Sequence, residues 1–285
     1  MIKTTKTSSV PSIKPHTQIL PPKGWGEFPL RELWEYRELL WFLTIRDIKA
    51  RYRQMALGPL WVLLNPVVHM IVFSLIFGGL AQLPSDGLPY PLFTYTALLP
   101  WNYFLGTTNG SVGSLVHHLG LISKVYFPRL IIPISALFGG LIDLMIAFLV
   151  LIAMMIYYGV MPSWNLWVLP FYVLFASATA LSISLWCAAI VVRFRDIQDI
   201  ITYGLSILMY ATPVAYSASL VPERWLWLYQ LNPMYWVIEG WRWGLLGSGQ
   251  PPQPFMLVSV AMVIILLISG IWIFHREERT IVDWL

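Results

Sequence analysis

The chain has 285 residues, of which 58% are hydrophobic and 11% are charged, and its mean hydropathy is +0.67. This composition excludes an ordinary soluble domain. The formal charge of +4 would suggest a nucleic-acid partner in a soluble protein, but here it fits the basic flanks of membrane helices that face anionic lipid.

The N-terminal segment divides into two parts. Residues 1–29 carry five prolines among Ser, Thr and Lys, which predicts a flexible cytoplasmic tail. Residues 30–53 predict an amphipathic helix whose apolar positions recur at helical spacing: Leu30, Leu33, Trp34, Trp41, Ile45, Ile48 and Tyr52. A basic helix that contains Trp lies along the headgroup boundary. It either anchors the chain only, or it also docks a cytoplasmic partner.

Six long apolar runs follow between Pro59 and Phe274. A run of about 20 residues spans the ~30 Å hydrocarbon core as a helix that satisfies its own backbone hydrogen bonds. We therefore predict an all-α polytopic membrane protein, with a six-span transmembrane domain over 54–275 and a cytoplasmic tail over 276–285. The predicted spans are 59–80, 93–115, 131–157, 167–191, 200–217 and 254–274.

The basic residues orient these spans. Of the 18 Lys and Arg, ten precede the first span, and only Arg224 and Arg242 fall on the opposite side of the membrane if the N-terminus is cytoplasmic. The positive-inside rule therefore places both termini in the cytoplasm.

One acidic residue, Asp143, falls within a predicted span. Because an ionised carboxylate at the bilayer centre costs about 2.5–3.5 kcal/mol, Asp143 should face protein or water. It is either a proton relay or a hydrogen-bonded structural residue. The preceding Gly139 and Gly140, and the pair Gly106 and Gly110 in the second span, predict close helix packing.

The segment 223–243, between spans 5 and 6, is rich in aromatic and charged residues and is broken by Asn232 and Pro233. It predicts two short helices around a turn. They form either an interfacial aromatic belt or an external re-entrant hairpin that lines the exit of a path. The spacing of Glu239 and Arg242 favours the hairpin, because this pair can neutralise itself at membrane depth.

The sequence lacks the motifs of common enzymes. It contains neither a G-x-x-x-x-G-K-[ST] phosphate loop nor an H-E-x-x-H metal motif. Asp196 and Asp199 could suggest a metal-dependent glycosyltransferase, but they lie in a short connection between spans and are better explained as a solvated loop. We expect no catalytic residues, no metal and no cofactor bound by this chain.

Several local motifs together resemble a known family. RDIKARYRQMALGPLWVLLNP (46–66), LLPWNYFLG (98–106), LISKVYFPRLIIPIS (121–135), VVRFRDIQDI (191–200), TPVAYSASLVP (212–222) and LNPMYWVIEGWRWGLLG (231–247) occur in this order. They resemble the permease subunits of ABC-2 type exporters, above all the branch that exports O-antigen, capsule and teichoic acid.

The resemblance implies a homodimer of permeases on a dimer of separate ATPase subunits, which would bind ATP and Mg. It assigns coupling to the ATPase to Ser123, Lys124, Phe127, Pro128 and Arg129, and places Arg193, Arg195 and Asp196 on the same cytoplasmic side. The interface helix would contribute Trp34, Trp41, Arg46, Asp47 and Arg51. The external gate and glycan path would contain Trp225, Trp227, Tyr229, Tyr235, Trp236, Glu239, Trp241 and Arg242.

The resulting functional prediction is ATP-driven export of a lipid-linked surface polysaccharide across a bacterial inner membrane. Two alternatives stay open: an ABC-2 exporter of a drug or other small amphiphile, and a proton-coupled secondary transporter or flippase that uses Asp143.

Overall fold

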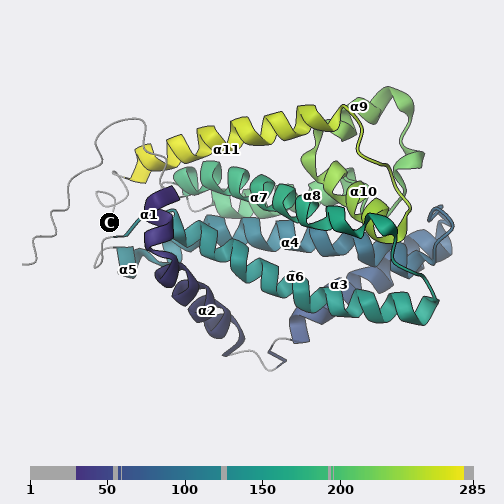
Figure 1. Ribbon diagram of the computed structural model, residues 1–285, viewed down its shortest axis with the longest axis horizontal. Helices are drawn as coiled ribbons and strands as arrows, with labels where there is room; N and C mark the ends of the chain where they lie inside the picture. Colours follow the sequence, from purple (N-terminus) through teal and green to yellow (C-terminus); the bar gives the residue numbers. More distant parts are fainter. Residues whose placement is uncertain are drawn as a thin grey trace, which may run out of the picture.

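The computed structural model describes residues 30–53, 57–58, 60–122, 127–191, 194 and 196–278, and the secondary structure within these ranges is helical (Figure 1). The first half of the chain forms α1 (Leu30–Glu35), α2 (Arg37–Arg53), α3 (Leu60–Phe73), the π-helical η1 (Ser74–Leu80), α4 (Tyr90–His117), α5 (Leu119–Ile122) and α6 (Ile131–Tyr158). The second half forms η2 (Trp164–Val168), α7 (Leu169–Val191), α8 (Ile197–Ala211), η3 (Ala218–Leu220), α9 (Glu223–Leu231), α10 (Pro233–Leu246) and α11 (Met256–Glu278).

Helix α4 forms the centre of the bundle. It packs against α3, α6, α7, α8 and α10, and Trp101 and Phe104 are among its fully buried side chains. Its hydroxyl groups are accommodated locally, since Thr96 and Thr108 each donate a 2.8 Å hydrogen bond to the carbonyl oxygen one turn earlier. A helix with many small polar residues can therefore lie inside an apolar bundle.

Four helical segments in the described part of the chain are long and apolar enough to cross a membrane: Leu60–Leu80, Ile131–Tyr158, Trp164–Ala188 and Met256–Glu277. They correspond to the predicted spans 1, 3, 4 and 6. Helix α4, at the predicted span 2, has 28 residues but contains many Thr, Ser and Asn residues. Helix α8, at the predicted span 5, has 15 residues and is only about 22 Å long.

The predicted helical span over 200–217 is wrong beyond Ala211, where α8 ends. Thr212 is extended, with φ −106° and ψ 142°. The next residue is Pro213, which disfavours helical geometry in the residue before it and cannot donate a backbone hydrogen bond. The chain therefore leaves the helix there and turns back toward α9.

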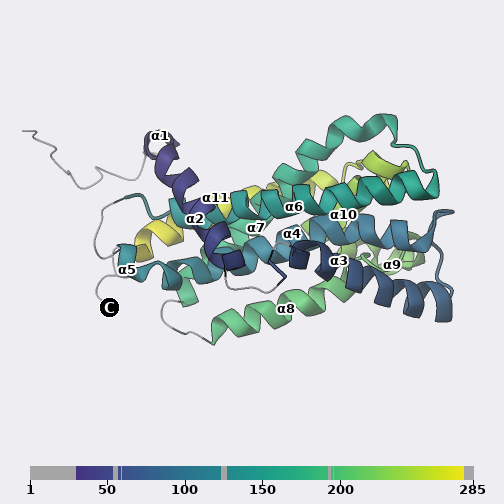
Figure 2. The ribbon, with the colours of Figure 1, turned by 90° about the horizontal axis from the view of Figure 1, so that it is seen from below.

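The segment 30–53 forms two helices, α1 and α2, that meet at Tyr36. Trp34 and Trp41 are exposed, whereas the buried positions of α2 are Leu43 and Thr44, which lie outside the predicted apolar stripe. Helix α2 packs along α6 and runs in the same direction from the end of the bundle that carries α5 (Figures 1 and 2).

Candidate functional site

The hairpin of α9 and α10 lies at the end of the bundle opposite to α1 and α5 (Figure 1). Its turn is fixed by Asn232, whose Oδ1 accepts a 3.0 Å hydrogen bond from the Met234 N–H. Its Nδ2 donates to Thr212 Oγ1 at 2.9 Å. Pro233 occupies the first position of α10, where the missing N–H costs nothing. The two predicted short helices around a turn are therefore present.

The pair Glu239 and Arg242 is buried inside this end of the molecule. Arg242 Nη1 lies 3.2 Å from Glu239 Oε1, and the two side chains are 0% and 3% exposed. The sequence spacing predicted that these charges would pair, and they do. Because an isolated buried charge is very costly, each side chain makes the burial of the other possible.

Arg242 also holds the turn that follows α8. Its Nη1 donates to the Pro213 carbonyl oxygen at 2.8 Å, and its Nη2 donates to that of Val214 at 2.8 Å. The guanidinium carbon lies 3.7 Å from the centre of the Phe93 ring in α4. Arg242 thus joins α10, the 212–217 turn and the central helix.

A second loop closes over Glu239. The Gln250 N–H donates a 3.0 Å hydrogen bond to Glu239 Oε2. This approach requires Gly249, which has φ +89° and whose hypothetical Cβ would lie 2.9 Å from the Glu239 carbonyl oxygen. Only glycine combines that backbone conformation with so little space.

The aromatic residues assigned to the external gate fall into two groups. Tyr235, Trp236 and Trp241 of α10 are buried among α4, α7 and their surroundings. By contrast, Trp225 and Trp227 of α9 are about half exposed, at 48% and 55%, and Tyr229 packs against the core. The exposed aromatic surface of the hairpin therefore belongs to α9.

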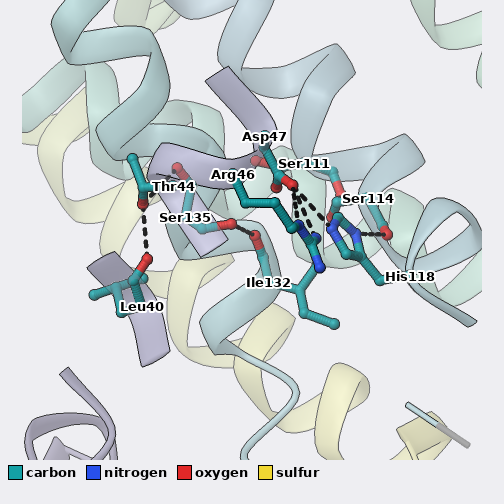
Figure 3. A network of polar contacts seen from close by, with 9 residues as sticks. All are labelled: Leu40, Thr44, Arg46, Asp47, Ser111, Ser114, His118, Ile132 and Ser135. Atoms are coloured by element: carbon teal, nitrogen blue, oxygen red, sulfur yellow. Dashed lines mark hydrogen bonds and ion pairs between the residues drawn. The ribbon is translucent and has the colours of Figure 1, made fainter. Parts of the chain in front are cut away.

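At the opposite end, a polar network joins α2 to α4 (Figure 3). Asp47 Oδ1 accepts hydrogen bonds from Arg46 Nη2 at 2.8 Å and Nε at 3.1 Å, and it lies 3.3 Å from His118 Nε2. The other ring nitrogen of His118 is 2.7 Å from the Ser114 carbonyl oxygen. Burial alone would raise the pKa of Asp47, but the hydrogen bonds and charges of His118 and Arg46 outweigh it and lower the pKa.

Helix α2 also contacts α6 at two places. Thr44 Oγ1 lies 3.5 Å from the Ser135 carbonyl oxygen, a long contact. Further along, Arg51 Nη1 donates to Asp143 Oδ2 and the Tyr52 hydroxyl donates to Asp143 Oδ1, each at 2.7 Å. Asp143 therefore has a hydrogen-bond partner on each carboxylate oxygen. This arrangement agrees with one of the two explanations that the sequence left open, a hydrogen-bonded structural residue.

The coupling-loop residues are only partly within the described chain. Phe127 is 3% exposed and belongs to a small apolar core with Leu43, whereas Pro128 and Arg129 are half-buried. Asp196 is exposed next to the start of α8. Ser123, Lys124, Arg193 and Arg195 lie outside the described residues.

Sequence reasoning missed the partners that these residues meet at long range. Tyr52 was assigned to an apolar stripe, and His118 was not assigned a role, yet they contact Asp143 and Asp47. Since these partners are 91 and 71 residues away in the chain, no local spacing could have identified them.

Residues 38–246 match the model of the ABC-2 type transporter family. The chain belongs to this family. This ABC-2 protein is 33% identical over 255 residues to the O-antigen export system permease protein RfbA of Myxococcus xanthus. The aligned residues cover 87% of this chain and 96% of the relative. It is 29% identical to the protein of the same name from Klebsiella pneumoniae, over 84% of this chain and 92% of the relative.

A more distant relative carries a different name. The polysialic acid transport protein KpsM of Escherichia coli is 24% identical over 83% of this chain and 92% of its own length. The family predicted from the ordered sequence motifs is thus confirmed.

Proposed function

We propose that this chain is the membrane permease subunit of an ATP-driven exporter that moves a lipid-linked surface polysaccharide across a bacterial inner membrane. The observation that carries this proposal is the full-length similarity to proteins named as O-antigen export permeases, with 96% of the Myxococcus relative covered. Because the alignment extends over nearly the whole relative, the cargo class is inferred from a complete permease and not from a shared fragment.

A second feature supports a path between two copies of the chain. Helix α8 exposes one stripe along its length, formed by Ile200, Tyr203, Ile207 and Tyr210. Tyr203 is 72% exposed and lies two helical turns before Tyr210. In a homodimer, six spans from each copy would enclose a channel in which such rings contact sugars weakly enough to let them slide.

We place the end with α1, α2 and α5 in the cytoplasm, with both termini on that side, and the α9–α10 hairpin at the external end as a re-entrant gate. The positive-inside distribution of Lys and Arg supports this orientation. A separate ATPase dimer, which would bind ATP and Mg, would dock near Arg129 and the exposed Asp196. Movement of the ATPase would then pass to the bundle through the α5–α6 connection.

The proton-coupled alternative has less support. Both oxygens of Asp143 accept hydrogen bonds, from Arg51 and Tyr52, so the carboxylate already has partners for both of its oxygens. A relay group would have to leave these partners in each cycle.

Depletion of the protein in its native host tests the proposal. We expect lipid-linked glycan to accumulate on the cytoplasmic side and to disappear from the cell surface. Normal surface glycan together with altered sensitivity to small toxic amphiphiles would support the drug-export alternative and contradict the proposed cargo.

Coupling to the ATPase through the loop that contains Arg129 is tested by a separate variant. Arg129→Glu should abolish glycan display at normal protein levels, and Arg224→Glu, at the opposite end of the bundle, is the matched control. The buried Phe127 is less suitable, because its truncation would destabilise the small core around Leu43. Equal export by both charge variants would count against coupling through this loop.

A further inference from the structure

A cavity of about 190 Å³ lies among the end of α2, the beginning of α3, and the facing sides of α4 and α6. On a comparable scale, a cavity of about 150 Å³ accommodates a benzene ring. The space is therefore large enough for one six-membered ring. It forms where Gly106 of α4 has no neighbouring atoms within 4 Å of its hypothetical Cβ, so the predicted close helix contact is missing at this glycine.

The lining combines aromatic rings with hydrogen-bond donors and hydrogen-bond acceptors. Trp61 and Tyr103 contribute rings, and Asn65, Arg51 and Asp143 contribute polar groups. The Tyr103 hydroxyl is 2.6 Å from Ser177 Oγ, so that group is already engaged elsewhere. Asn102 also lines the cavity, and its buried side-chain nitrogen has no hydrogen-bond partner in the described part of the chain.

The charges of this lining cancel. Arg51 and Asp143 are paired at 2.7 Å, and the remaining polar side chains are neutral amides and hydroxyls. A phosphate would meet the Asp143 carboxylate, and a cation would meet the Arg51 guanidinium. The lining therefore favours a neutral ligand that donates and accepts many hydrogen bonds and has an apolar face for an aromatic ring.

The position of the cavity allows such a ligand to reach it. Trp61 and Asn65 lie in the first two turns of the candidate span Leu60–Leu80, so the cavity is near one membrane boundary. Helix α6 has 28 residues and is about 42 Å long, which exceeds the ~30 Å hydrocarbon core. Its first turns can therefore extend beyond the membrane, and Asp143 need not lie at the bilayer centre.

We propose that this cavity binds one sugar ring of the transported glycan at the membrane boundary, with Trp61 against the ring face and Asn102, Asn65 and the Arg51–Asp143 pair bonded to its hydroxyls. This inference rests on the proposed function and adds a sugar-binding site within each single subunit, apart from the exposed stripe of α8. Binding there would also bridge α2 to α6, because Arg51 and Asp143 come from these two helices.

The test is site-specific photo-crosslinking of the full chain in its native host. Photo-reactive benzoylphenylalanine replaces Trp61 in one strain and Tyr210 of the α8 stripe in another. A third strain carries it at Trp164, which is 97% exposed outside the cavity, as the background control. Adducts are probed with an antibody against the surface glycan, and tritiated glycerol marks phospholipid adducts.

We expect glycan adducts at Trp61 and Tyr210 above the level at Trp164. Asn102→Leu should reduce the Trp61 adduct about three- to tenfold, which is the effect of losing one hydrogen bond. Asn165→Leu, outside the cavity, should leave it unchanged.

Three other results would overturn the cavity site, and a fourth would contradict the proposed function. Glycan at Tyr210 with none at Trp61 would overturn the cavity site and leave the proposed function standing. Glycerol label alone at Trp61 would identify a phospholipid occupant and would also overturn it. A Trp61 adduct that Asn102→Leu does not reduce would contradict recognition inside the cavity. Failure to detect glycan at either position, while the protein is present, would contradict the proposed function itself.

Discussion

Two ion pairs in this molecule have similar chemistry and opposite surroundings. Glu239 and Arg242 are three residues apart in α10, and both side chains are almost completely buried. Arg51 and Asp143 are 92 residues apart, and their side chains are 42% and 23% exposed. The first pair fixes one end of the bundle because neither charge can be left alone there. The second joins two helices by a contact that solvent can replace, so α2 can separate from α6 at a lower cost.

The largest expected effect comes from breaking the buried pair. Arg242→Met leaves Glu239 as an unpaired buried carboxylate and releases the 212–217 turn, so it should destabilise the protein by about 3–5 kcal/mol. Thermal unfolding of the purified protein in detergent measures this loss.

Arg224→Met, at an exposed position of α9, is the matched control for this variant and should change stability little. The double variant Glu239→Gln with Arg242→Met should be more stable than Arg242→Met alone. A double variant as unstable as the single one would show that the carbonyl contacts of Arg242, and not its charge, dominate.

A smaller loss of stability is expected when the loop over Glu239 is disturbed. Gly249→Ala adds left-handed backbone strain of roughly 1–2 kcal/mol and places a methyl group against α10. Gly159→Ala is the matched control, since Gly159 also has a positive φ, +67°, but open space around its Cβ position. Gly249→Ala should therefore lower the unfolding temperature more. Equal losses would mean that backbone strain alone explains both.

The half-exposed pair should tolerate substitution better. Asp143→Asn keeps a side-chain acceptor for Tyr52 but removes the charge opposite Arg51, and it should cost about 1 kcal/mol. The charge-reversed double variant Arg51→Asp with Asp143→Arg should recover part of this loss. If Asp143→Asn destabilised the protein as strongly as Arg242→Met, the contrast between the two pairs would be refuted.

The last expected effect appears only at alkaline pH, as a pH dependence at the end of α2. Burial, followed by the hydrogen bond and charge of Asp143, raises the pKa of Tyr52 from its ordinary value of 10.0 to about 12. Because the folded state holds this proton more tightly, the stabilising contribution is complete below pH ~10 and is lost as the pH rises toward about 12. The difference in tyrosinate absorbance between the native chain and Tyr52→Phe measures this titration. A Tyr52 that ionises near pH 10 would contradict the contact with Asp143.

Local sequence signals predicted the elements whose causes are local. The apolar runs gave four segments that meet the requirements for a membrane span, and the Asn232–Pro233 break gave the hairpin turn. The spacing of Glu239 and Arg242 predicted their pairing. The end of α8 was missed, although Pro213 was a visible signal, because the apolar run continues through it.

Long-range contacts could not be predicted in the same way. The apolar stripe of residues 30–53, which includes Trp34 and Trp41, predicted a face for the headgroup boundary but no contact with another helix. Packing on α6 buries Leu43 and Thr44, which lie outside that stripe. The partners of Asp143 and Asp47 also depend on where α2 lies. Periodicity reports which residues share a face of one helix, but it does not report which neighbour covers that face.

The sequence by itself determined the membrane character, the ABC-2 family and the positions of most helices, because hydrophobic length, basic flanks and ordered motifs are properties of contiguous residues. The tertiary structure alone decided that α4 is the central helix despite its polar residues, that α10 is buried while α9 is exposed, and that Asp143 is paired with α2. The physical reason is that burial and charge neutralisation depend on distances between segments far apart in the chain.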